Sequence, residues 1–339
     1  MDDNYIFEKS NSPKDTVNNN DYNSTKIIPF SQCKYENFQM RKHFDIVTNK
    51  VNSMDVSSCG NFMASSTDDD EIYIFDLLLG SEINNIKIQK YGCNHIIFTN
   101  NKLDILHTST KINNDIRLLS LEEKKYIRYF NGHKNNVLSV SISPNNETFL
   151  SSCSDGRIKL WDLRSEECCA TSNYCHVNPR VSYDPKGIIY AISEERNIVK
   201  FFDSRYMNDR PFKIIPLRSS LRKIKNIKFS LDGRKIIAST DGDFFYLIDT
   251  FTNEKMFFEG ISNHKNMNFG IDFSPCGKYI VAGSDYGDLI YYDAVEGKFL
   301  KKFKSVHKDH VENVIFHKKY FMLITGANDI IFWTPDFDD

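Results

Sequence analysis

A pattern that repeats about every 40 residues constrains this chain more than any other feature of its sequence. The clearest unit extends from Gly132 to Asp162. It holds three short apolar segments separated by the turn sequences Ser143-Pro-Asn-Asn146 and Ser154-Asp-Gly156. A fourth segment follows Asp162, and four short strands at this period are typical of one sheet in a circular array. The repeat therefore predicts an all-β fold made of similar four-stranded sheets.

The number of units can be counted from Asp162, the end of the third strand in the clearest unit. Equivalent positions, which we call markers, lie 41 to 46 residues apart, at Asp76, Ser120, Asp162, Asp203, Asp249, Asp293 and Thr334. A large apolar residue precedes each marker, from Phe75 to Trp333, even where the sequence Trp-Asp is absent. Seven markers predict a seven-bladed β-propeller.

The two ends of the repeat region predict how the ring closes. The last unit stops near Trp333 without a fourth strand, which would leave an open sheet edge. Residues 35–43 precede the first unit, so we expect them to supply that strand. Residues 1–33 are rich in Asn, Asp, Ser and Lys and poor in apolar side chains, which predicts a disordered tail. The domain boundaries are thus 1–33 for the tail and 34–339 for the propeller.

Composition restricts the classes of function. A formal net charge of -2 provides no overall field that would draw the protein onto nucleic acid or a membrane, and we expect no direct sequence-specific binding to nucleic acid. The apolar stretch Ile72–Leu79 is far shorter than the ~20 residues of a membrane span, and the first ten residues, MDDNYIFEKS, lack the pattern of a signal peptide. The eight cysteines show no disulfide spacing, so reduced thiols are expected.

Motifs that would indicate catalysis or a cofactor are missing from the sequence. No phosphate-binding glycine loop is present. Cys168, Cys169, Cys175 and His176 do not have the spacing of a zinc site, and the histidines at 307, 310 and 317 lack a matching thiol or carboxylate pattern. We therefore expect no catalytic residues, no metal, no cofactor and no enzymatic activity.

The best-preserved unit contains a candidate hydrogen-bonded tetrad of His133, Ser152, Asp155 and Trp161. The imidazole would link the turn carboxylate to a strand hydroxyl and to the indole N–H. Such a network inside one blade satisfies buried polar groups, so its expected role is structural and not catalytic.

One basic run has two interpretations. Positive side chains are concentrated between positions 218 and 228, at Arg218, Arg222, Lys223, Lys225 and Lys228. They alternate with apolar residues, which is typical of a strand with one solvated face. The functional alternative is a local site for phosphate groups formed by Arg218, Arg222, Lys223 and Lys225.

Several motifs resemble one family of propellers. They include Lys125 to His133, Thr148 to Ser165 with Trp161-Asp-Leu-Arg164, Phe273-Ser-Pro-Cys-Gly277 and Phe332-Trp-Thr-Pro335. From about residue 36 onward the chain resembles the WD-repeat protein 82/Swd2 family of WD40 propellers. The resemblance implies a nuclear, non-catalytic adaptor in COMPASS/Set1-type histone lysine methyltransferase complexes. It also implies membership in assemblies that contain protein phosphatase 1 or cleavage and polyadenylation factors, and binding to the phosphorylated C-terminal repeats of RNA polymerase II.

Two other functional classes of propeller are alternatives to this family. The tetrapeptide Trp161-Asp-Leu-Arg164 matches the WDxR pattern of substrate receptors for cullin-4 ubiquitin ligases, in which Arg164 would face the adaptor. A phosphoinositide-binding propeller would require adjacent arginines, which this chain lacks.

The phase of the repeat also predicts where partners bind. Loops that link one blade to the next open on the same face as the turns between the second and third strands. We expect partner contacts there from Tyr91, Asn136, Ser154 and Phe269, and chiefly from the two aromatic rings. The alternative is that both rings pack between neighbouring blades.

Overall fold

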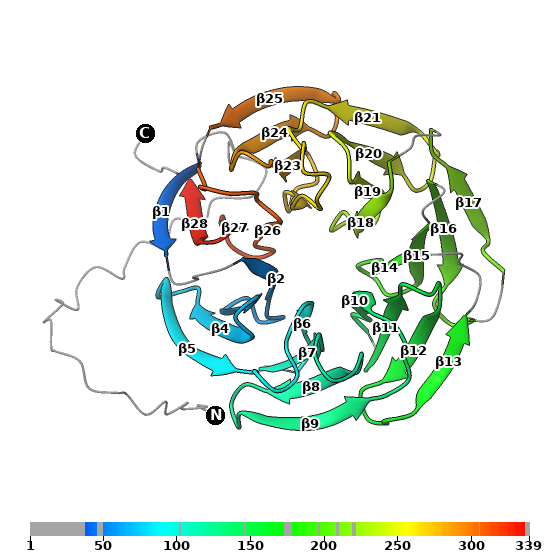
Figure 1. Ribbon diagram of the computed structural model, residues 1–339. Helices are drawn as coiled ribbons and strands as arrows, with labels where there is room; N and C mark the ends of the chain where they lie inside the picture. The colour runs from blue at the N-terminus through cyan, green and yellow to red at the C-terminus, as the bar shows by residue number, and fades with distance from the viewer. Residues whose placement is uncertain are drawn as a thin grey trace, which may run out of the picture. The chain divides into compact units, whose positions relative to one another are not determined.

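The ring of sheets is defined by a computed structural model, in which residues 38–45, 50–101, 103–145, 147–172, 178–194, 197–207, 210–218, 222–304 and 306–335 are described. They form seven four-stranded antiparallel sheets arranged around a common centre, which confirms the seven-bladed propeller (Figure 1). The tail expected at residues 1–33 lies outside the described residues. The described part of the chain contains no helix long and apolar enough to cross a membrane.

Each sheet runs from an inner strand at the centre of the ring to an outer strand at its rim (Figure 1). Sheets 1 to 3 consist of β2 (Val51–Val56), β3 (Phe62–Thr67), β4 (Glu71–Asp76) and β5 (Ser81–Lys87); β6 (Ile96–Phe98), β7 (Asp104–Thr108), β8 (Ile116–Ser120) and β9 (Lys125–Phe130); and β10 (Val137–Ile142), β11 (Thr148–Cys153), β12 (Ile158–Asp162) and β13 (Cys168–Ser172). Sheets 4 and 5 consist of β14 (Arg180–Tyr183), β15 (Ile189–Glu194), β16 (Ile198–Asp203) and β17 (Lys213–Pro216); and β18 (Ile224–Phe229), β19 (Lys235–Thr240), β20 (Phe244–Asp249) and β21 (Lys255–Glu259). Sheets 6 and 7 consist of β22 (Ile271–Phe273), β23 (Tyr279–Gly283), β24 (Leu289–Asp293) and β25 (Lys298–Phe303); and β26 (Asn313–Phe316), β27 (Leu323–Gly326), β28 (Ile330–Pro335) and β1 (Phe38–Phe44).

The markers recur because five of them are aspartates that end a third strand and cap the turn that follows. A short carboxylate at this position can accept the backbone N–H groups that the turn leaves unpaired. Asp249 Oδ1 accepts the N–H of Phe251 at 2.8 Å and that of Thr252 at 2.9 Å. Asp76, Asp162, Asp203 and Asp293 cap their turns in the same way. The period read from the sequence is therefore the period of a turn-capping carboxylate.

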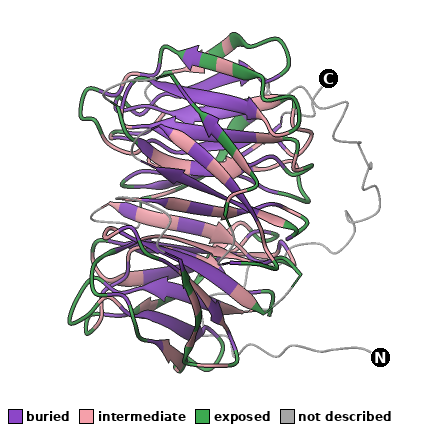
Figure 2. Ribbon diagram, turned by 90° about the vertical axis from the view of Figure 1, so that its right-hand side faces the viewer, coloured by how far each residue is buried: buried purple, intermediate pink, exposed green. Residues whose placement is uncertain are grey.

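The apolar core lies between neighbouring sheets. Sheets 4 and 5 enclose a cluster that includes Phe201, Ile215 and Tyr246, and sheets 5 and 6 enclose a second one around Phe245 and Tyr292. Central strands are buried on both faces, while exposed residues are concentrated in loops and outer strands (Figure 2). Removing this much apolar surface from water drives the stacking of the sheets.

Hydrogen bonds across the inner strands join several sheets to the next one. Ser139 Oγ and Ser141 Oγ in β10 accept the backbone N–H groups of Val181 and Tyr183 in β14, each at 2.9 Å. Asp55 in β2 does the same for the N–H of Phe98 in β6, at 2.7 Å. These bonds pair inner-strand N–H groups that would otherwise have no partner at a sheet edge. They also fix the angle between successive sheets.

The segment before the first unit closes the ring, as predicted. β1 pairs antiparallel with β28, with Phe38 opposite Pro335 and Phe44 opposite Ile330. Phe44 also contacts the rings of Phe75 and Phe332, with centroid distances of 5.1 and 5.0 Å. One strand from the start of the chain thus completes the sheet formed by its end and covers the outer edge of β28.

Candidate protein-binding surfaces

The ring presents two loop surfaces. We call one the linker face: it carries the loops that link consecutive sheets and the turns between second and third strands. We call the other the opposite face: it carries the turns after first and third strands, including every marker. The assignment follows from the antiparallel order of the four strands in each sheet.

Sheet 3 contains a hydrogen-bonded network, but its hydroxyl is that of Ser151 and not the predicted Ser152. Ser151 Oγ accepts the Trp161 Nε1–H at 2.8 Å and lies 2.6 Å from His133 Nε2. Phe149 is opposite Trp161 in the ladder, so Ser151, two residues on, shares a face with both. Ser152 points to the other face, where its Oγ lies 2.8 Å from that of Ser139.

The predicted carboxylate does not complete this network. Asp155 Oδ1 instead accepts the backbone N–H of Arg157 at 3.0 Å, and His133 Nδ1 is buried without a partner among the described residues. Burial, with a contribution from the charge of Lys159, lowers the pKa of His133 to about 4, so the ring is neutral at pH 7. The network pairs buried polar groups of sheet 3, and its structural role stays a prediction.

A complete tetrad occurs in sheet 7, where the sequence had suggested only isolated histidines. His307 Nε2 lies 2.7 Å from Thr325 Oγ1, which accepts the Trp333 Nε1–H at 2.9 Å. His307 Nδ1 binds Asp329, whose second oxygen lies 2.7 Å from His43 Nε2 in the closing strand. His307 and Thr325 are 18 positions apart, as are His133 and Ser151, and that common spacing was the signal that could have revealed it.

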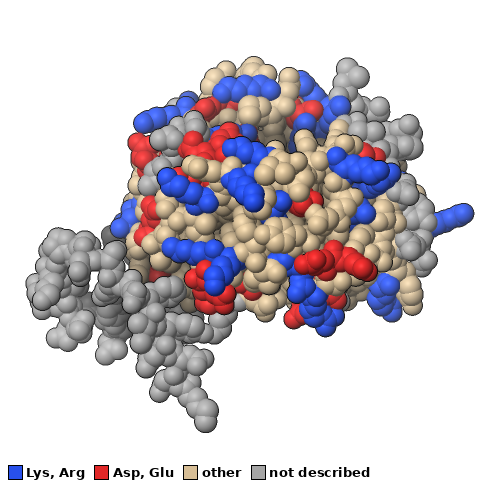
Figure 3. Space-filling view, turned by 60° about the horizontal axis from the view of Figure 1, so that its bottom comes forward, with Lys and Arg blue, Asp and Glu red and all other residues tan. Residues whose placement is uncertain are grey.

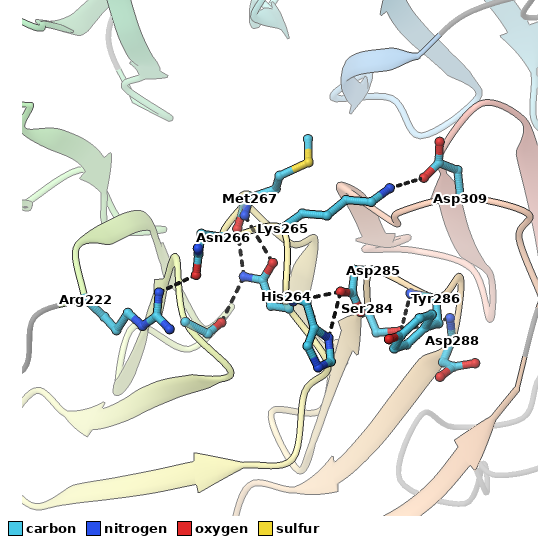
Figure 4. Close-up of polar contacts among 12 residues, drawn as sticks. Arg222, His264, Lys265, Asn266, Met267, Ser284, Asp285, Tyr286, Asp288 and Asp309 are labelled. Atoms are coloured by element: carbon cyan, nitrogen blue, oxygen red, sulfur yellow. Dashed lines mark hydrogen bonds and ion pairs between the residues drawn. The ribbon is translucent and has the colours of Figure 1, made fainter.

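Loops of sheets 5 to 7 form a polar site on the linker face (Figure 4). Asp285 is buried, and its Oδ2 accepts the backbone N–H of His264 at 2.7 Å and lies 3.1 Å from the ring Nδ1. The His264 side chain is 72% exposed, and its ring centroid lies 5.6 Å from that of Tyr286. Sequence analysis missed this site, although Ser284-Asp285-Tyr286-Gly287 has the turn pattern of Ser154-Asp155-Gly156.

Residues of the predicted basic run border this site without forming a single cluster. Within the run, Arg222 hydrogen-bonds the Asn266 side chain (Figure 4). Lys265, which lies outside the run, forms an ion pair with Asp309 at 2.9 Å, and this pair raises the pKa of the lysine. Arg218 and Lys223 are exposed on the same linking loop.

The other two basic residues lie on the inner strand β18. Lys225 is half-buried there. Lys228 is directed to Asp272 of the next sheet, at 2.7 Å, so it stabilises the ring. The linker-face part of the predicted phosphate site is therefore Arg218, Arg222 and Lys223.

Tyr91 lies on the linker face, as predicted, but it also has an intramolecular role. Its half-buried ring stacks on the guanidinium of Arg117, with 3.8 Å from Cζ to the ring centroid, and packs edge-on against Tyr126. Arg117 is almost fully buried and receives further support from Asn113 at 2.9 Å. Tyr91 covers a buried charge, and its binding of a partner stays a prediction.

The expectation for Phe269 is wrong. Its side chain is 0% exposed and packs in the cluster between sheets 5 and 6, because it lies at the end of the linking loop, where the chain turns into β22. Asn136 and Ser154 do lie together on the linker face, joined by a backbone hydrogen bond of 3.0 Å, with Asn136 exposed. Their contact with a partner stays a prediction.

Arg164 is on the opposite face. Its guanidinium forms a two-point ion pair with Asp162, with distances of 2.9 and 2.7 Å, while the side chain stays 74% exposed. Arg205 forms the same pair with Asp203 one sheet later. The ion pair of the exposed arginine with the capping aspartate thus occurs in two neighbouring sheets.

The charged side chains and thiols of the described residues are distributed as follows. In the view of Figure 3, lysine and arginine side chains alternate with aspartate and glutamate over the surface. The described residues contain no group of three or more His, Cys, Asp or Glu side chains placed to hold a metal ion. All six cysteines in the described ranges are free, and Cys175 and His176 lie outside those ranges.

Comparison with known proteins places this architecture in a family. Residues 37–76 and 124–162 match the family model of the WD domain, G-beta repeat. WD repeat-containing protein 82 of Drosophila melanogaster is 34% identical over 302 residues, which cover 88% of this chain and 94% of that protein. The chain belongs to the WD-repeat protein 82/Swd2 family.

Fungal members of the WD-repeat protein 82/Swd2 family show the same extended similarity. Set1 complex component swd2 of Schizosaccharomyces pombe is 30% identical, with 78% of this chain and 75% of that protein covered. COMPASS component SWD2 of Saccharomyces cerevisiae is 26% identical, with 84% and 91% covered. The similarity thus includes the weakly patterned sheets as well as the sheet with the full Trp-Asp signature.

Proposed function

We propose that this chain is a nuclear, non-catalytic adaptor subunit of a Set1/COMPASS-type histone lysine methyltransferase complex. The observation that carries the proposal is similarity over most of the chain to two proteins named as components of those complexes. The fold suits the role, because a closed ring of seven sheets presents two broad loop surfaces to protein partners. By the same family resemblance, the proposal includes assemblies with protein phosphatase 1 and with the 3′-end processing machinery.

Purification of the tagged full-length chain from nuclear extract, followed by mass spectrometry, tests this proposal. We expect a SET-domain methyltransferase and its associated subunits in stoichiometric amounts, together with phosphatase or cleavage-factor subunits. An unrelated tagged propeller serves as the control. Recovery of cullin-4 ligase subunits in place of the methyltransferase would instead support the role that the Trp161-Asp-Leu-Arg164 sequence suggests.

We further propose that the linker face of sheets 5 and 6 binds the phosphorylated C-terminal repeats of RNA polymerase II. Arg222 and Lys223 are exposed on the loop that enters sheet 5, and Lys265 lies on the next linking loop. Arginine pairs with phosphate oxygens through two parallel hydrogen bonds. The exposed Tyr286 and His264 rings could pack against an apolar residue of the repeat.

Fluorescence anisotropy with a labelled two-repeat peptide tests this site. We expect the phosphorylated peptide to bind more tightly than the unphosphorylated one. Arg222→Gln or Lys223→Gln should weaken binding about tenfold, since one charge-assisted hydrogen bond is worth roughly 1.5 to 3 kcal/mol. The matched control is Lys134→Gln, because Lys134 is an exposed lysine on another linking loop of the same face. Equal binding of the two peptides, or an equal effect of all three substitutions, would exclude the site.

A further inference from the structure

The position two residues after each marker changes in chemistry around the opposite face. In six sheets this residue is exposed, and it is apolar in sheets 1, 5 and 6, acidic in sheet 2 and basic in sheets 3 and 4: Leu78, Glu122, Arg164, Arg205, Phe251 and Val295. The fold needs only the capped backbone N–H at this position, so it does not require a large apolar side chain there. Phe251 is nevertheless 73% exposed.

Phe251 belongs to a group of four exposed apolar side chains on adjoining turns of sheets 4 and 5. We call Ile188, Tyr206, Leu231 and Phe251 the apolar patch; their exposed fractions range from 44% to 73%. Monomeric proteins seldom expose several large apolar side chains together without a binding role.

Hydrogen bonds between the turns hold the apolar patch together. Within sheet 4, the Ser204 N–H donates to the Ile188 carbonyl at 3.0 Å. Within sheet 5, Thr250 Oγ1 donates to the Gly233 carbonyl at 3.1 Å. A Cβ placed on Gly233 would lie 3.6 Å from Pro185 Cδ, so the first turns of the two sheets are in contact. The four side chains thus lie on turns that contact one another.

The exposed charged side chains around the apolar patch are mostly basic. Most carboxylates of these turns are engaged with their own backbone: Asp184 accepts the Ile189 N–H at 2.9 Å and Asp232 accepts the Arg234 N–H at 3.0 Å. Among the described residues of these turns, Glu254 is the exposed acid without a capping role. The basic side chains, by contrast, are exposed at Lys186, Arg205, Arg210 and Arg234, and Arg164 extends this character into sheet 3. An arginine has five N–H donors, and the pair with Asp203 occupies two of those of Arg205.

We propose that the apolar patch binds an extended segment of another protein in which large apolar side chains are followed by acidic ones. The apolar side chains would cover Phe251 and Leu231, and the carboxylates would reach Arg205 and Arg164 in the neighbouring sheets. Burial of an exposed aromatic ring provides the affinity, and the charges fix the direction of the segment. The surface is separate from the linker face, so this proposal holds or fails independently of the RNA polymerase II proposal.

Selection from a random twelve-residue peptide library displayed on phage tests the proposal, with the full chain as bait. Peptides that also bind the double variant Leu231→Asp/Phe251→Asp are discarded, because they bind outside the apolar patch. We expect the enriched peptides to combine apolar and acidic residues. One enriched peptide, synthesised with a fluorescent label, should bind roughly tenfold more weakly to Phe251→Asp and to Arg205→Ala. Its affinity should also fall with added salt.

The matched control is Leu78→Asp. Leu78 also lies two residues after a capping aspartate, its N–H is bound at the same 2.8 Å, and it is 61% exposed, but it belongs to sheet 1. It should leave peptide binding unchanged. Because Phe251 is exposed, Phe251→Asp should retain the melting temperature of the parent chain. If its melting temperature falls, Ile188→Asp replaces it as the variant that tests peptide binding.

Three results would overturn the proposal. The first is that no peptide is enriched over the double variant. The second is enrichment of peptides without acidic residues, or of peptides that Phe251→Asp still binds. The third is sedimentation of the parent chain as a dimer that Phe251→Asp dissociates, because the occupant would then be a second copy of this chain.

Discussion

One hydroxyl in sheet 7 pairs two buried side chains: it accepts the Trp333 indole N–H and bonds the Nε2 of His307. Thr325→Val keeps the shape of the side chain but leaves the Trp333 N–H, 2.9 Å from the lost oxygen, and His307 Nε2 unpaired. We expect the free energy of unfolding to fall by about 2 to 4 kcal/mol, since each orphaned group costs about 1 to 3 kcal/mol. Urea denaturation followed by tryptophan fluorescence measures this.

Ser65→Ala is the control for that substitution. Ser65 occupies the equivalent position in sheet 1, but Phe75 replaces the tryptophan and the buried hydroxyl has no partner among the described residues. Its removal should leave stability unchanged or slightly higher. Equal losses of unfolding free energy in the two variants would mean that stability depends on a hydroxyl at this position and not on its hydrogen bonds.

His107 predicts a dependence of stability on pH. The ring is fully buried, neither nitrogen has a partner in the described chain, and burial lowers its pKa to about 3. The unfolded chain binds a proton below about pH 6.5 while the folded chain does not. Stability is therefore complete above pH 6.5 and declines toward pH 3, by up to about 1.4 kcal/mol per pH unit.

The substitution His107→Leu removes this contribution, so the plot of unfolding free energy against pH should be flatter between pH 7 and pH 4. The unfolding free energies of the variant and of the parent chain, measured by denaturation at four pH values, test this prediction. The remaining slope should come from groups such as His133, whose pKa is also lowered by burial. Parallel curves would show that His107 is protonated in the folded protein.

Two sequence predictions about single residues were wrong for physical reasons. A strand places neighbouring residues on opposite faces, so a choice between Ser151 and Ser152 depends on the register with β12, which the sequence does not specify. Phe269 was correctly placed on a linking loop, but the direction of a loop side chain depends on which neighbouring sheet covers it. Turn-capping aspartates were predictable because their role is local.

The closing strand gives the clearest test at the scale of elements. A chain that lacks residues 1–45 loses β1, exposes the edge of β28 and removes Phe44 from its contacts with Phe75 and Phe332. We expect low soluble yield and a melting temperature lower by many degrees. A chain that lacks only residues 1–33 should melt like the parent. Similar melting of both truncations would show that β1 is dispensable.

The order and number of strands followed from the sequence because the marker acts at short range. An aspartate that caps a turn two residues away leaves the same local pattern in five of the seven sheets, however much the rest has diverged. Contacts between sheets leave no such pattern. The His264–Asp285 site and the apolar patch depend on turns that are far apart in sequence, so they emerged only from the structure.

At the scale of the whole molecule, side chains at the centre connect the sheets into one cooperative unit. Asp55, Ser139 and Ser141 each bind the inner strand of the next sheet. A closed ring with such bonds has no terminal repeat that can unfold alone, in contrast to an open array. We therefore infer that a substitution at the centre destabilises the whole ring.

Asp272 offers the sharpest test of that inference, because it joins three consecutive sheets. From β22 of sheet 6, its Oδ2 accepts the Phe316 N–H of sheet 7 at 2.9 Å and lies 2.7 Å from Lys228 Nζ of sheet 5. Asp272→Ala should lower the free energy of unfolding by about 2 to 4 kcal/mol, because it leaves a buried N–H and a partly buried ammonium unpaired. Asp272→Asn should cost less, since the amide oxygen can still accept the Phe316 N–H. Asp68→Ala, at an exposed carboxylate, is the control and should change nothing. In urea denaturation the transition should shift as a whole with an unchanged slope; a second transition would show that sheets 5 to 7 unfold separately, and equal losses for the Ala and Asn variants would assign the effect to Lys228 alone.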